Sequence, residues 1–115
     1  MTVGELAQRL GAVNLSDAGT GRAVTGGFSC DVISQAMARG FRGMAWITVQ
    51  ANMNALAVAV MTGAACLIFP EGMKAEKTVI ERAAIEGIAL LSAEDAAFEL
   101  AGRLYAGLRG EVHHE

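Results

Sequence analysis

The sequence predicts an α/β protein: a three-layer α/β/α domain built on a largely parallel sheet of about five strands. Short apolar runs alternate along the chain with segments of helical periodicity, which is the order of parallel strands joined by helices. The 28 residues from Gly43 to Pro70 carry no charge, although 18% of the chain is charged, so this segment is expected inside the fold. A chain of 115 residues suffices for one ordinary domain.

Ten elements are expected. In chain order they are a helix at 2–11, strands at 12–15 and 23–29, a helix at 31–39, a strand at 44–49, a helix at 52–62, a strand at 65–69, a helix at 74–86, a strand at 88–91 and a helix at 93–108. Together they form a single domain over residues 1–108, and residues 109–115 are expected to be a flexible C-terminal tail.

Local signals predict the elements of the first half. Thr2 and Glu5 have the spacing of a capping box, which predicts the first helix. Two short runs of strand-forming residues then flank a loop of small polar residues. Asp31 follows the second strand and is expected to cap the second helix, which Gly40 should end.

The second half begins with the uncharged segment. Gly63 divides it into a strand and a helix before it and a strand after it, and Pro70 ends that last strand. An amphipathic helix follows and is expected to stop at Gly87. After a short apolar strand, Ser92 is expected to cap the last helix, with Asp95 three residues further on.

Composition argues against several classes of protein. The basic residues are scattered and the net charge is −3, so no nucleic-acid partner is expected. The longest apolar stretch, residues 55–70, is shorter than the roughly 20 residues of a membrane-spanning helix, and no signal-peptide pattern opens the chain. Cys30 and Cys66 have neither zinc-site nor redox-motif spacing. As free thiols they fit a reducing, cytoplasmic location.

No catalytic pattern is present in the sequence. The glycine-rich stretch from Gly19 to Gly27 lacks the Lys of a phosphate-binding loop and flanks a strand instead of opening a helix. G-x-S-x-G is absent, and the two histidines, His113 and His114, lie in the predicted tail, where a solvated role is favoured over adventitious metal binding with Glu115. We therefore expect a protein that is not an enzyme and needs no cofactor or metal.

Polar side chains gather at the predicted carboxyl ends of strands, where open α/β sheets bind ligands. Gln50 and Asn54 interrupt an uncharged segment, and buried amides need partners. Asp31 and Asn52 are either ligand contacts or helix caps. Thr25, Gly26 and Gly27 fall inside a predicted strand, where adjacent glycines indicate a bulge or the close approach of another backbone or a ligand.

These residues resemble the DRTGG domain family over about residues 3–105. The matching positions are Arg22, Thr25-Gly26-Gly27, Asp31, Ser34, Trp46 to Gln50, and Met53-Asn54. Where the family has Asp before the Arg, this chain has Gly21. The resemblance implies a fold similar to the N-terminal domain of HPr kinase/phosphorylase. It also implies a non-catalytic regulatory module, of the kind found in phosphotransacetylases and, beside nucleotide-binding CBS domains, in inorganic pyrophosphatases, with a tendency to form oligomers.

Two functional hypotheses follow. In the first, a regulatory domain senses a small, nucleotide-like ligand and modulates a partner enzyme or signalling protein. Its binding residues would be Arg22 (which the resemblance adds), Thr25, Gly26, Gly27, Asp31, Gln50, Asn52 and Asn54. In the second, the chain is an oligomerisation or protein-interaction module without a small ligand. The helix at 52–62 is apolar on every side, so either neighbouring helices cover it or another subunit packs on it. A homo-oligomer is expected in either case.

Overall fold

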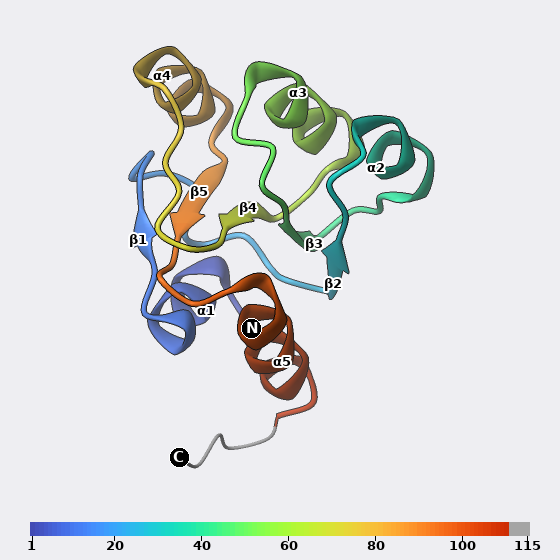
Figure 1. The fold of residues 1–115 in the computed structure, drawn as a ribbon, viewed down its shortest axis with the longest axis vertical. Helices are drawn as coiled ribbons and strands as arrows, with labels where there is room; N and C mark the ends of the chain where they lie inside the picture. Colours follow the sequence, from blue (N-terminus) through green and yellow to red (C-terminus); the bar gives the residue numbers. More distant parts are fainter. Residues whose placement is uncertain (111–115) are drawn as a thin grey trace.

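The computed structural model describes residues 1–110, which form five helices and a five-stranded sheet (Figure 1). In chain order the elements are α1 (Val3–Leu10), β1 (Val13–Asn14), β2 (Gly26–Ser29), α2 (Ile33–Arg39), β3 (Met44–Ile47), α3 (Met53–Thr62), β4 (Cys66–Phe69), α4 (Lys77–Glu86), β5 (Ala89–Ser92) and α5 (Ala97–Leu108). The predicted alternation of strands and helices is confirmed. Most of the predicted tail, with His113 and His114, lies outside the described residues.

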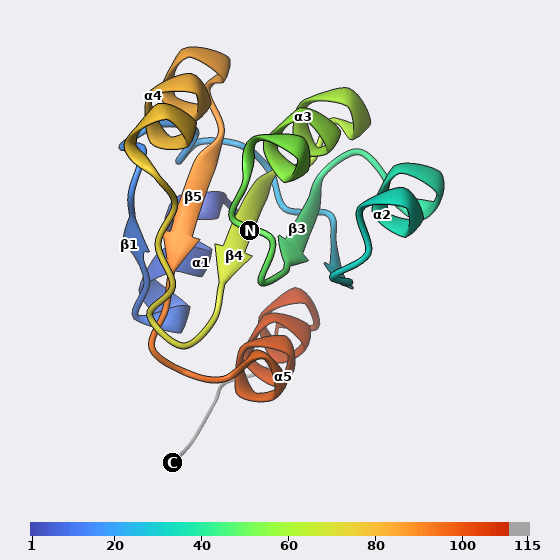
Figure 2. The same cartoon turned by 45° about the horizontal axis from the view of Figure 1, so that its top comes forward.

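The sheet has the strand order β1-β5-β4-β3-β2, and β2 to β5 run parallel. Only β1 is antiparallel, paired with β5. The connecting helices α2, α3 and α4 all lie on one face, and α1 and α5, from the two ends of the chain, cover the other (Figures 1 and 2). This confirms the predicted α/β/α architecture, and it leaves β2 as an edge strand beside α5.

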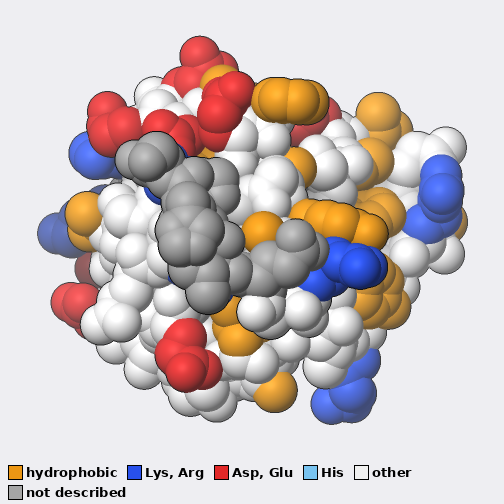
Figure 3. Space-filling view, turned by 90° about the horizontal axis from the view of Figure 1, so that it is seen from below, with side chains coloured by type: hydrophobic (Ala, Val, Ile, Leu, Met, Phe, Trp, Pro, Cys, Tyr) orange, Lys and Arg blue, Asp and Glu red, His pale blue; other side chains and the backbone are white. Residues whose placement is uncertain are grey.

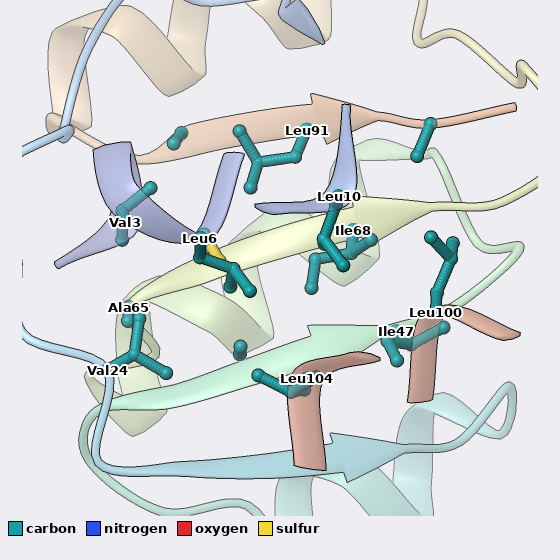
Figure 4. Packing of buried hydrophobic residues seen from close by; sticks show 14 residues of the cluster. Val3, Leu6, Leu10, Val24, Ile47, Ala65, Ile68, Leu91, Leu100 and Leu104 are labelled. Atoms are coloured by element: carbon teal, nitrogen blue, oxygen red, sulfur yellow. The ribbon is translucent and has the colours of Figure 1, made fainter. Parts of the chain in front are cut away.

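Alternation along the central strands divides the core into two layers. In β3, Trp46 packs with the α2–α4 layer and its neighbour Ile47 packs with the α1–α5 layer. Successive side chains of a strand point to opposite faces, so strands with no polar residue are what a sheet covered on both sides requires. Figure 4 shows the α1–α5 layer, in which Leu6 and Leu10 of α1 and Leu104 of α5 lie over the sheet.

The predicted capping box is confirmed, and of the two alternatives left open for Asn52 the structure shows the helix cap. Thr2 and Glu5 form the reciprocal capping box of α1, with the backbone N–H of Thr2 donating to Glu5 Oε1 at 2.8 Å. That bond, together with the Thr2 hydroxyl, lowers the pKa of Glu5 from its ordinary value. Asn52 caps α3, because its Oδ1 accepts the backbone N–H of Ala55 at 2.9 Å.

Two other predicted caps are wrong. Helix α2 begins one residue later than Asp31 could cap it: its N-cap is Val32, which makes no side-chain cap bond. Ser92 remains in β5, and its hydroxyl donates to the backbone carbonyl of Met73 at 2.7 Å, while α5 begins after Ala96. In both cases the side chain that a local pattern predicted as a cap forms a hydrogen bond to a residue distant in sequence instead.

No helix within residues 1–110 combines the length and the apolarity needed to cross a bilayer. The uncharged segment is the strand–helix–strand unit β3-α3-β4, and its strands are buried at every position.

Candidate functional site

A single carboxylate ties the end of β2 to the end of β3. Asp31 Oδ1 accepts the backbone N–H of Val49 at 2.8 Å and the hydroxyl of Thr48 at 3.1 Å. Thr48 is buried, and its Oγ1 accepts the backbone N–H of Gln50 at 3.1 Å. Parallel strands end at one edge of the sheet, so these bonds fasten the two loops that follow β2 and β3 to each other.

The amides that follow β3 extend this network. Gln50 Nε2 donates to the backbone carbonyl of Asp31 at 2.9 Å, and Gln50 Oε1 accepts from Asn52 Nδ2 at 2.8 Å. Asn54 is exposed on the first turn of α3. The structure thus brings three of the sequence-predicted site residues together through bonds to one another. Of the two amides for which the sequence predicted partners, Gln50 has them, and Asn54 is exposed.

Arg22 and Thr25 lie at the opposite end of the strands from the Asp31 network. Arg22 Nε donates to the backbone carbonyl of Gly87 at 2.9 Å, just before β5 begins. The Thr25 hydroxyl donates to the backbone carbonyl of Arg42 at 2.9 Å, just before β3 begins. These side chains brace the amino ends of the strands, so the eight residues proposed from the sequence do not form one cluster.

Gly26 and Gly27 are placed where neighbouring side chains leave no room for a Cβ atom. A Cβ on Gly26 would lie 2.9 Å from the ring of Phe41, and one on Gly27 would lie 2.8 Å from Cδ2 of Leu104 in α5. Real Cβ atoms essentially never approach other heavy atoms this closely. The adjacent glycines therefore allow side chains of the same chain, above all from α5, to approach β2 closely.

Beside this contact a groove of about 420 Å³ opens between the edge strand and the last helix. We call it the β2–α5 groove. Its lining residues are Gly27, Phe28, Ser29, Ile47, Ala101, Leu104, Tyr105, Leu108 and Arg109. Figure 3 views this side of the molecule, where apolar side chains lie beside basic ones on the half that holds β2 and α2. The volume of the β2–α5 groove is within the usual range for small-molecule sites.

Tyr105 and Arg109 give the groove its polar end. The guanidinium carbon of Arg109 lies 5.5 Å from the centroid of the Tyr105 ring, and Arg109 Nη1 is 3.4 Å from the tyrosine hydroxyl. This is the geometry of a cation–π pair. No residue of the last helix was among the sequence-predicted site residues, so this pair was missed, although the i, i+4 spacing of an aromatic and an arginine near a helix end was a usable signal.

The groove adjoins the Asp31 network along the chain. Ser29 and Ile47 line the groove, and Asp31 and Thr48 follow them by two residues and one residue. The candidate site therefore consists of the β2–α5 groove with the Asp31 network at the carboxyl ends of its two strands.

The two cysteines differ in chemistry. Cys66 is fully buried in β4, and burial raises the pKa of its thiol to about 12, so it stays protonated and unreactive at neutral pH. Cys30 is partly exposed, with Sγ 3.5 Å from the backbone carbonyl of Val32. Within residues 1–110, no three His, Cys, Asp or Glu side chains are grouped to hold a metal ion.

Comparison with known proteins identifies a similar fold. No family model and no curated protein matches the chain. A solved structure does match: the CBS and DRTGG domains of the regulatory region of Clostridium perfringens pyrophosphatase, complexed with the activator diadenosine tetraphosphate. The TM-score is 0.67 and the sequence identity 17%, over 90% of this chain and 45% of that one. The chain therefore spans about half of that structure and shares its fold over that part, in agreement with the expected DRTGG-like architecture.

Proposed function

We propose that this chain is a regulatory domain that binds a small, nucleotide-like anion in the β2–α5 groove and modulates a partner enzyme or signalling protein. The observation that carries the proposal is the groove itself, which has apolar walls and an aromatic–arginine pair at one end. The solved structure of similar fold is a regulatory region complexed with an activator nucleotide, which supports the same class of function.

The groove offers a nucleotide-like ligand two kinds of contact. Leu104 and Leu108 of α5 and Ile47 of β3 provide an apolar surface for a flat ring. Arg109 presents a planar guanidinium that can bind a phosphate oxygen pair, and its packing on Tyr105 restricts where that guanidinium lies. Because β2 pairs with another strand on one side only, its outer edge offers further backbone N–H groups.

Binding there would change how α5 sits on the sheet. The close contact between Gly27 and Leu104 holds α5 against β2 at one end of the groove. A ligand wedged between the two elements would shift α5, and the Asp31 network would carry the displacement of β2 to the loops after β3. The proposal assigns these residues binding and relay roles and no catalytic step.

A thermal-shift screen against nucleotides and acyl phosphates tests the proposal. A ligand that binds only the folded state raises the melting temperature, by about 10 °C at a concentration about a hundred times the dissociation constant. Arg109→Gln and Tyr105→Leu should abolish the shift. Arg82→Gln, which removes an exposed arginine on the opposite face of the sheet, should preserve it. A flat response to the whole panel, or a shift that survives both groove substitutions, would contradict the proposal.

The second candidate function is self-association without a small ligand, and the surface of α3 favours it. Met53, Val60 and Met61 are exposed on a helix that has no charged residue, and Met61 is 70% exposed. Together with Ala57, Leu56 and the α4 residues Arg82 and Glu86 they line a second groove, of about 290 Å³. Large exposed apolar patches mark interaction sites. Light scattering that compares the molecular mass of Met61→Ser with that of the unaltered chain tests this candidate. An equal mass would exclude self-association through α3.

A further inference from the structure

Helix α5 exposes two aromatic side chains to solvent. Phe98 is 85% exposed and Tyr105 is 62% exposed, while Leu100 and Leu104 on the opposite side are buried. Positions 98, 102, 105 and 109 repeat at i, i+4, i+7 and i+11, so they form one stripe along the helix. Aromatic and arginine side chains are the residues most enriched at the energetic centres of protein interfaces.

Gly102 lies in the middle of this stripe, and no contact within residues 1–110 requires a glycine there. A Cβ on Gly102 would meet no atom within 4 Å. Glycine in a helix interior lowers helix stability relative to alanine. The other glycine of α5 is different, because a Cβ on Gly107 would lie 2.8 Å from Arg9 Nε of α1. Gly107 thus faces side chains of the same fold, whereas Gly102 meets none among the described residues and leaves room for an approach from outside.

In one arrangement of two copies, the charged residues beside this stripe pair with those of the second copy. Glu99 and Arg103 flank the same side of the stripe, one turn apart, on either side of Gly102. If a second α5 crosses antiparallel about a two-fold axis near Gly102, each Glu99 faces Arg103 of the second copy. The same operation places Phe98 of one copy beside Tyr105 of the other, and the two Gly102 backbones meet at the crossing point.

We propose that this chain forms a two-fold symmetric homodimer through α5, with Phe98 and Tyr105 interleaved over Gly102 and with reciprocal Glu99–Arg103 ion pairs. In a parallel two-fold pairing the charged flanks of the two helices would lie on opposite sides of the seam and could not pair, so the antiparallel arrangement is the one that the charges select. Arg103 already lies 3.4 Å from Asp95 of its own chain. In the dimer a second carboxylate would join that pair at the rim of the interface.

The dimer shares Tyr105 with ligand binding in the β2–α5 groove, and Phe98 separates the two proposals. Phe98 and Gly102 line a separate hollow beside α5, of about 540 Å³, and Phe98 lines no part of the β2–α5 groove. Tyr105 borders both. Substitutions of Phe98 therefore test the dimer alone, and loss of ligand binding by Arg109→Gln would leave this inference untouched.

Sedimentation velocity across the micromolar range gives the first test. The unaltered chain should be a dimer that dissociates on dilution, and Phe98→Ser should raise the dissociation constant about tenfold or more. Ile85→Ser is the matched control, because Ile85 is 75% exposed on α4, in the opposite layer of the fold. A strictly monomeric unaltered chain, a dimer that survives Phe98→Ser, or a dimer lost in Ile85→Ser would each overturn the proposal.

Gly102→Ala gives a second test, because it should change dimer affinity and monomer stability in opposite directions. It should weaken the dimer by holding the helices apart. In the monomeric Phe98→Ser background the same substitution should raise the melting temperature, because alanine favours the helix. A purely structural role for Gly102 would lower the melting temperature there and would contradict the inference.

Charge reversal tests the register. Glu99→Arg and Arg103→Glu should each prevent self-association, since every facing pair then carries like charges. Mixing the two variants should restore a heterodimer, in which both pairs are again opposite in sign. Circular dichroism confirms that each variant is folded before mixing. Failure of two folded variants to associate on mixing, although the unaltered chain dimerises, would exclude the proposed pairing.

Discussion

The indole N–H of Trp46 donates a 2.8 Å hydrogen bond to the backbone carbonyl of Cys30. Trp46 is fully buried in the centre of β3, and Cys30 is the first residue after β2. The bond satisfies the one polar atom of the largest core side chain. The bond also ties the end of the edge strand β2 to the core, while the carboxylate of Asp31 ties it to the loop after β3. The end of β2 is thus held at two points next to the proposed ligand groove.

Trp46→Phe should lower the free energy of unfolding by about 2 kcal/mol, because it leaves the Cys30 carbonyl without its donor and leaves a void beside it. Urea denaturation followed by circular dichroism measures this. Trp46 is the single tryptophan of the chain, so its fluorescence independently reports the burial in the unaltered protein. An unfolding midpoint equal to that of the unaltered chain would show that the indole bond does not hold the strand end.

Asp31→Ala should lower the free energy of unfolding by about 1–2 kcal/mol, since the substitution removes the acceptor of the Val49 N–H and of the Thr48 hydroxyl. Asp31→Asn keeps an oxygen acceptor in the same place and should lose less than half as much. Urea midpoints of the two variants separate the hydrogen bonds from the charge. Equal losses in both variants would assign the effect to the charge instead.

The sequence predicted the sheet well because burial on both faces leaves a clear pattern. Strands β3 and β4 are apolar at every position, and Gly63 and Gly87 end the helices α3 and α4 with left-handed backbone conformations. Asn52 was left as either a ligand contact or a helix cap, and the structure shows the cap. Each of these features depends on residues within one turn or one strand of each other, so local physics is sufficient to recognise them.

The candidate site was harder to predict, because its geometry depends on contacts distant in sequence. The carboxylate of Asp31 was free to cap the helix after it or to bond the loop after β3, and the sequence cannot rank those two partners. Gly27 indicated close approach, but Leu104, 77 positions later, is what approaches. Arg22 and Gln50 were grouped as site residues, and the parallel strands place them at opposite edges of the sheet.

Gly27→Ala should destabilise the fold by about 1–2 kcal/mol, because the new methyl group would lie 2.8 Å from buried Leu104 and would push α5 from the sheet. Gly21→Ala is the control. Its Cβ meets nothing within 4 Å, so its unfolding midpoint should be unchanged or slightly higher. Urea denaturation compares them. If the two variants unfold at the same urea concentration, Gly27 does not owe its place to the α5 contact.

The two thiols should differ in reactivity. Iodoacetamide at pH 8 should label partly exposed Cys30 in the folded protein, whereas Cys66 should react only when the chain unfolds. Cys30→Ser should therefore remove the fast phase of labelling and keep the slow one. Mass spectrometry of the modified peptides follows both sites. Fast labelling of Cys66 under native conditions would contradict its burial in β4.

The raised pKa of Cys66 also predicts a loss of stability in alkaline solution. Burial raises this pKa from 9.0 to about 12. Below pH 9 the thiol is neutral in both folded and unfolded chains, so its ionisation does not lower the free energy of unfolding. Between pH 9 and about 12 only the unfolded chain ionises, and the free energy of unfolding should fall by up to about 1.4 kcal/mol per pH unit from this group. Cys66→Ala removes the titrating group, so its stability should decline less steeply than that of the unaltered chain over this interval. Urea denaturation from pH 8 to pH 11 measures both slopes, and parallel slopes would mean that the Cys66 thiol ionises as readily in the folded chain as in the unfolded one.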